Sequence, residues 1–83
     1  MIKDIYNALQ EKFENGEIKL MDFSGEHLGH GDHVKEASHL RVYIISEKFE
    51  GLSKVNRQRM VNEILSPFFN QGLHAVELYL ETE

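Results

Sequence analysis

The sequence predicts a two-layer α+β domain, in which two helices cover one face of a three-stranded mixed sheet in the order α-β-β-α-β. Apolar residues recur at helical spacing in two segments, and two other segments alternate as strands do. A helix joins the last two strands, and such a crossover makes them parallel with a right-handed connection. The length of 83 residues fits a single domain over residues 1–83.

The chain is expected to open with an amphipathic helix over residues 2–14. The pair Asn15-Gly16 supplies a stop, because both residues adopt a left-handed conformation after a helix at low cost. The next segment, 17–23, is short and rich in large apolar residues, and it predicts the first strand. The apolar stripe of the helix comprises Ile2, Ile5, Leu9 and Phe13.

The middle of the chain combines a polar loop with the most clearly predicted strand. Residues 24–38 contain three glycines and show no period, which indicates a long loop. Residues 39–46 are β-branched and aromatic, and a turn with Gly51 follows them. The strand is expected to place Leu40, Val42 and Ile44 on one face and Arg41, Tyr43 and Ile45 on the other.

The second helix is expected to begin after Ser53, a favourable N-cap, and to end at Gly72. Pro67 interrupts its apolar stripe, which predicts either a kink or a second short helix capped by Ser66. Residues 73–81 then alternate as the last strand. The face of this strand that meets the core is expected to carry His74, Val76, Leu78 and Leu80.

Composition excludes several classes of protein. The chain has no cysteine, so disulfides and a self-contained thiolate site for zinc or iron–sulfur are excluded, and any thiolate must come from a partner. No apolar run is long enough to target or span a membrane, so we expect a cytoplasmic protein. The net charge of −5 disfavours nucleic acid, and no nucleophile–base pair stands out, so we expect no enzyme.

Four of the five histidines cluster around one loop of the predicted domain, in "HLGHGDH" (27–33) and at His39. Parallel strands start at the same edge of a sheet, so His74 is expected to meet the loop that feeds the preceding strand. The spacing of His27, His30 and His33 does not select a metal, since imidazole suits zinc, copper, iron and nickel alike. His39 opens a strand and is interpreted as structural, or as a group that orients a metal ligand.

The sequence resembles the BolA family from about residue 22 to residue 80. The resemblance includes the family's Ser-x-x-His-x-x-His pattern and a His-Ala pair after the second helix, and it implies a fold like a type II KH domain. The middle histidine of the family's Arg-His-Arg is Gln58 here, so its role is not carried over. The matching segments are "D-x-S-x-x-H-x-x-H" (Asp22, Ser24, His27, His30), "SHLRVYIISEKFEGLSKVNRQRMVNEIL" (38–65) and "LHAVEL" (73–78).

This resemblance implies a non-catalytic iron–sulfur adaptor. BolA-like proteins pair with monothiol glutaredoxins and share a bridging 2Fe–2S cluster, which the glutaredoxin cysteine and glutathione bind on one side. The histidine of the His-Ala pair, here His74, and a loop histidine bind the other side. By position the loop ligand is His30, with His27 second and His33 third. Two imidazoles on one iron resemble a Rieske centre, whose reduction potential is raised.

Two other functions remain open. A local basic patch with Lys54, Arg57 and Arg59 is expected to contact a protein partner, or to support weak DNA binding by a KH-like transcriptional regulator. Against nucleic acid, the chain is acidic and the Gly-x-x-Gly loop of KH domains is missing. The histidine loop alone is a further candidate site for zinc or copper.

Overall fold

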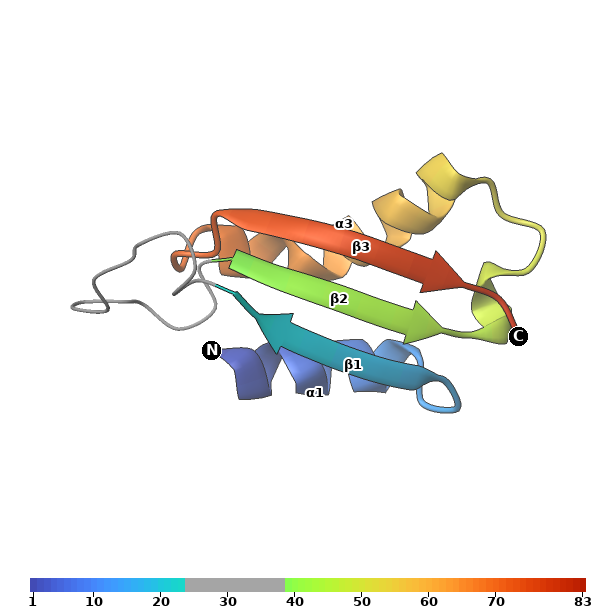
Figure 1. Ribbon diagram of the computed structural model, residues 1–83, viewed down its shortest axis with the longest axis horizontal. Helices are drawn as coiled ribbons and strands as arrows, with labels where there is room; N and C mark the ends of the chain where they lie inside the picture. The colour runs from blue at the N-terminus through green and yellow to red at the C-terminus, as the bar shows by residue number, and fades with distance from the viewer. Residues whose placement is uncertain (24–38) are drawn as a thin grey trace.

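The computed structural model describes residues 1–23 and 39–83. Along the chain it has α1 (Ile2–Lys12), β1 (Glu17–Asp22), β2 (His39–Ile45), the 3-10 helix η1 (Glu47–Phe49), α3 (Lys54–Phe69) and β3 (Ala75–Glu81). The predicted order α-β-β-α-β is confirmed (Figure 1). The predicted loop 24–38, with His27, His30 and His33, lies outside the described residues.

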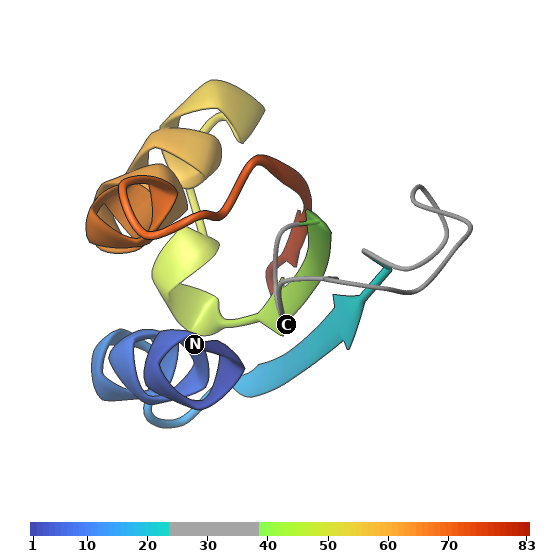
Figure 2. The same cartoon turned by 90° about the vertical axis from the view of Figure 1, so that its left-hand side faces the viewer.

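The three strands form one mixed sheet in the order β1-β2-β3. β1 is antiparallel to β2, and β2 is parallel to β3, as predicted from the helical crossover between them. Both helices cover the same face of the sheet, and among the described residues the other face carries no helix (Figure 2). The α+β class with a three-stranded mixed sheet is therefore confirmed.

The core lies between the helices and the central strand. β2 alternates as predicted, because every second residue, Leu40, Val42 and Ile44, is fully buried. The helix α1 ends at Lys12, slightly earlier than expected, but its apolar stripe extends to Phe13, which is fully buried and lies 5.1 Å from the Phe49 ring. The other residues of the core are Ile5, Leu9, Val61, Leu65 and Leu73.

The turn after β2 contains a short helix that the sequence did not reveal. In η1, the Lys48 backbone N–H donates to the Ser46 hydroxyl at 3.1 Å, which caps the turn. Phe49 enters the core from this element, and Gly51 follows with φ of +80°. Three residues are too few to show a helical period, so only the glycine was visible as a turn signal.

The helix α3 begins as predicted after Ser53, and it ends at Phe69, three residues before the predicted end at Gly72. The Asn56 N–H donates to the Ser53 hydroxyl at 3.1 Å, so Ser53 is the N-cap. The prediction of a separate helix capped by Ser66 is wrong, because α3 continues through Pro67 to Phe69. Pro67 lies in the last turn, where it removes a single helical donor. The chain then turns, and Gly72 has φ of +114°, as suits the end of a helix.

The last strand begins later than predicted, and this moves one histidine. β3 starts at Ala75, so the prediction that His74 is the second residue of the strand and shares its core face is wrong. His74 is exposed, immediately before the strand. Leu73, the residue before His74, is buried after the preceding turn. The chain is therefore anchored in the core at Leu73 and not at His74. The partly buried residues of β3 that pack on the core are Val76, Leu78 and Leu80, as predicted.

Neither helix has the character of a membrane span. α3, the longer of the two, has 16 residues and exposes a polar face with charged side chains. Across residues 1–23 and 39–83, no helix is both long enough and apolar enough to cross a membrane.

Candidate functional site

Those predicted functional residues that the structure describes lie at opposite ends of β3. Because β2 and β3 are parallel, their first residues share one edge of the sheet, where His39 and His74 lie. The start of α3, with Lys54 and Arg57, lies by the other end of β3 (Figure 1). A strand of seven residues, as β3 is, spans roughly 20 Å, and this separates the histidine edge from the basic patch.

At the histidine edge, the two described histidines are neighbours. The register pairs His39 with Ala75, and His74 precedes Ala75 in the chain. The ring centroids of His39 and His74 are 6.3 Å apart, and their planes are inclined by 38°. The prediction that the parallel crossover brings His74 to the start of β2 is therefore confirmed. Its approach to the loop histidines stays a prediction, since they lie outside the described residues.

The His39 ring is held in place by side chains on the helix-free face of the sheet. The Phe23 ring meets His39 edge-on at 5.7 Å, and the Phe23 backbone N–H donates to the His39 carbonyl at 3.0 Å. The Arg41 guanidinium lies over the Phe23 ring, 4.5 Å from its centroid. Its Nε also contacts Glu77 Oε1 at 3.1 Å. The partly buried His39 is thus fixed by its strand and its neighbours, whereas His74 is exposed.

The centre of the helix-free face carries an aromatic pair that sequence reasoning missed. Tyr43 and Tyr79 are paired in register and stack with ring centroids 4.8 Å apart. The Tyr79 hydroxyl donates to Glu77 Oε1 at 2.9 Å, and this bond, together with the charge of the carboxylate, raises the pKa of Tyr79 above 10.0. The alternation of β2 and β3 predicted the face of each tyrosine, but only the register pairs them.

The charges on this face are mixed. The residues that point to this face include two cationic side chains, Lys19 and Arg41, and three carboxylates. The face therefore lacks the excess of positive charge that phosphate binding requires. The three carboxylates are Glu17, Glu77 and Glu81.

At the other end of β3, Arg57 has a structural role. Its Nε donates to the Leu52 carbonyl and its Nη1 to the Leu80 carbonyl, each at 3.1 Å. Its guanidinium carbon also lies 5.9 Å from the centroid of the Phe49 ring. The guanidinium therefore connects the edge of β3 to the loop before α3, and it is only partly available to a partner.

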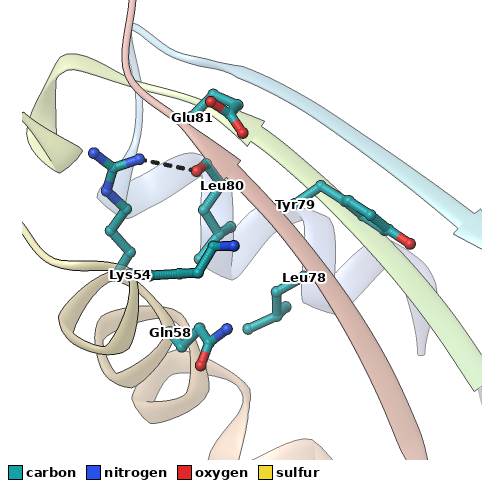
Figure 3. Close-up of a pocket in the computed structure, with 7 residues that line it drawn as sticks. Lys54, Gln58, Leu78, Tyr79, Leu80 and Glu81 are labelled. Carbon is teal, nitrogen blue, oxygen red and sulfur yellow. Dashed lines mark hydrogen bonds between the residues drawn. The ribbon is translucent and has the colours of Figure 1, made fainter.

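A hollow of about 190 Å³ opens beside Arg57, between the start of α3 and β3 (Figure 3). Lys54 and Gln58 line it from the helix, and the last residues of β3 line it from the sheet. Two of the three predicted partner-binding residues, Lys54 and Arg57, therefore meet at one hollow. Arg59 is exposed outside its lining. The residues contributed by β3 are Leu78, Tyr79, Leu80 and Glu81.

The described part of the chain offers few metal ligands. Within residues 1–23 and 39–83, no group of three or more histidine, cysteine, aspartate or glutamate side chains is placed to hold a metal ion. His39 and His74 bring two imidazoles to one edge of the sheet there, with ring centroids 6.3 Å apart. Because the whole chain lacks cysteine, this edge can contribute imidazoles to a metal centre but no thiolate.

Comparisons with known proteins agree on one family. A family model described as BolA-like protein matches residues 9–83. The DNA-binding transcriptional regulator BolA of Vibrio cholerae is 31% identical over 84 residues, covering 99% of this chain and 76% of that protein. The chloroplastic protein BOLA1 of Arabidopsis thaliana is 34% identical over 77 residues, which are 89% of this chain and 48% of that protein. The solved structure of BolA1 from Arabidopsis thaliana superposes with a TM-score of 0.85 at 33% identity, covering 96% of this chain and 88% of that one.

Proposed function

This chain belongs to the BolA-like protein family, and we propose that it is a non-catalytic adaptor that binds a monothiol glutaredoxin and shares a bridging 2Fe–2S cluster with it. Its role would be in cluster trafficking or maturation, or in the regulation of iron. The cluster is the cargo of the complex, and the adaptor contributes ligands and a docking surface.

The observation that carries the proposal is the position of His74. It lies exposed at the edge where β2 and β3 begin, and it is not held in the hydrogen-bond ladder of the strand. A second protein can therefore approach its imidazole without opening the fold. The lack of cysteine fits a shared site, since a 2Fe–2S cluster needs thiolates that only the partner and glutathione would supply.

The second protein ligand on this side is proposed to be His30, with His27 as the next candidate. Both belong to the segment that precedes β2 in the chain, and β2 starts beside His74. Two imidazoles on one iron would raise the reduction potential of the cluster relative to an all-thiolate one.

The proposed docking surface includes Lys54 and Arg59, which are both exposed. Arg57 contributes by shaping the hollow beside Leu80, since its donors already serve backbone carbonyls. A partner that contacts both this patch and His74 would have to cover the length of β3, roughly 20 Å. A partner that binds only the histidine edge would be insensitive to Lys54 and Arg59.

Co-assembly tests the proposal directly. The chain is mixed with a monothiol glutaredoxin, iron, sulfide and glutathione, and the product is separated by gel filtration. Visible absorption and circular dichroism of the complex should differ from those of the glutaredoxin alone. Single alanine variants of His27, His30 and His33 then identify the loop ligand. If the chain does not co-elute and the spectrum stays that of the glutaredoxin, the proposal fails.

DNA binding is the second candidate, because the Vibrio cholerae relative is named a DNA-binding transcriptional regulator. The mixed charge of the helix-free face and the engagement of Arg57 speak against a strong phosphate site. A salt titration of binding to duplex DNA separates the two functions, since phosphate contacts must weaken steeply as salt rises. Binding that survives physiological salt, and that Lys54→Ala and Arg59→Ala reduce, would favour this function.

A further inference from the structure

Two imidazoles from the starts of neighbouring parallel strands lie side by side at one edge of the sheet. The ring centroids of His39 and His74 are 6.3 Å apart, and the strand register pairs His39 with Ala75, the residue after His74. From the sequence alone, His39 is interpreted as structural, or as a group that orients a metal ligand, because it opens a strand and points away from the face of Leu40. The later start of β3 leaves His74 outside the strand, and its ring lies toward His39 instead of the core.

This separation is close to that of two imidazoles on one metal ion. With metal–nitrogen bonds of about 2.0–2.1 Å and tetrahedral geometry, two ring centres are roughly 5 to 6 Å apart. The rings observed at 6.3 Å would need to approach by roughly 0.3 to 1.3 Å. His74 can supply this movement, since it is exposed and its residue is outside the strand.

The surroundings orient one of the two rings in advance. His39 is fixed at the first position of β2 and lies edge-on against Phe23, which is only 6% exposed. Arg41, which lies over the Phe23 ring, is paired with Glu77, so its positive charge is partly compensated before a metal ion arrives. Because the His39 ring is already ordered, metal binding loses conformational entropy mainly at His74, which adjusts its position.

We propose that His39 and His74 form a two-imidazole site for a borderline divalent metal ion such as Zn²⁺, with its remaining positions open to water or to ligands from a partner. Imidazole nitrogen suits Zn²⁺, Cu²⁺ and Ni²⁺. No third ligand is placed at this pair among the residues that the structure describes, so the site would be incomplete by itself.

This two-imidazole site deepens the proposed function, because it lies at the same edge of the sheet. It rests on the proposed function only where His74 is used as a ligand of the shared cluster. It adds His39 as an imidazole that can contribute there beside His30 or His27. Metal binding by the chain alone involves no glutaredoxin. A test with Zn²⁺ alone can therefore fail while cluster sharing succeeds, or the reverse.

The chain allows a clean experiment, since it has only five histidines. In the variant His27→Ala/His30→Ala/His33→Ala, the remaining imidazoles are those of His39 and His74. Titration with Zn²⁺ should show one equivalent bound by calorimetry. In the same samples, the ring signals of both histidines should shift together in nitrogen-detected imidazole NMR spectra.

Adding His74→Ala or His39→Ala to this background should weaken Zn²⁺ binding by at least about tenfold. His39→Phe is the second variant, because it keeps a ring against Phe23 and removes the nitrogens, and circular dichroism checks that it folds. The inference is overturned if the triple variant binds no stoichiometric Zn²⁺, if only one ring responds, or if His39→Phe binds as tightly as its background.

Discussion

The Nη1 of Arg57 donates a hydrogen bond to the Leu80 carbonyl at 3.1 Å, and its Nε donates to the Leu52 carbonyl at the same distance. One guanidinium thus connects the edge strand β3 to the loop that precedes α3. The basic character of Arg57 predicts a place on a partner surface, and the structure gives this side chain a role within the fold. Its neighbour Arg59 is exposed and provides a matched comparison.

Arg57→Ala should lower the free energy of unfolding by about 1–3 kcal/mol, because two partly buried carbonyls lose a charged donor. Arg57→Lys should recover only part of this, since an ammonium cannot reproduce the planar fork. Arg59→Ala should change stability by less than about 0.5 kcal/mol. Urea denaturation measures all three, and equal effects of Arg57→Ala and Arg59→Ala would contradict the structural role.

Phe49→Ala should be among the most destabilising substitutions, at about 3–5 kcal/mol, because the ring is fully buried against Phe13. Phe69→Ala is the matched control, since Phe69 is 40% exposed at the end of α3 and should cost about 1 kcal/mol or less. Thermal or urea unfolding distinguishes the two. A loss at Phe49 no greater than that at Phe69 would show that η1 does not anchor the core.

Pro67→Ala should stabilise the protein by about 1–3 kcal/mol, because the alanine N–H can donate to the Glu63 carbonyl within α3. Pro67 is exposed, so little packing is lost. Ser66→Ala, at the adjacent exposed position, controls for helix propensity and should change stability by about 0.5 kcal/mol or less. If Pro67→Ala destabilises the chain, the proline ring has a packing role that its exposure does not indicate.

Tyr79 should titrate above its ordinary pKa of 10.0, because its hydroxyl donates to the Glu77 carboxylate. Folding favours the neutral phenol, so the contribution to stability is present below about pH 10 and is lost as pH rises through the raised pKa. Glu77→Gln should move the pKa of Tyr79 back toward 10.0, whereas Glu81→Gln should leave it raised. NMR titration of the Tyr79 ring decides between them, and an unchanged pKa in Glu77→Gln would contradict the assigned cause.

The sequence predicted the fold because its signals were local and repeated. Alternation in β2 and helical spacing in α1 and α3 reported which side chains are buried, and the crossover rule made β2 and β3 parallel. The start of β3 was missed because His74 continues the alternation of Val76 and Leu78. Alternation alone cannot tell where pairing with β2 begins.

The candidate site was predicted less completely, because its contacts depend on register and on side-chain direction. Chain order placed His74 at the start of β2, but only the pairing of His39 with Ala75 reveals that the two imidazoles are neighbours. In the same way, the sequence marked Arg57 as basic, but it could not show that Leu80 and Leu52 occupy its donors.

The most direct test of the account is the visible circular dichroism of the 2Fe–2S complex assembled with a monothiol glutaredoxin and the His74→Ala variant. Gln71→Ala, an exposed change in the same turn, is the matched control. Gln71→Ala should give the spectrum of the wild-type complex, and His74→Ala should give the spectrum of the glutaredoxin alone. A His74→Ala spectrum identical to that of the wild-type complex would contradict this account.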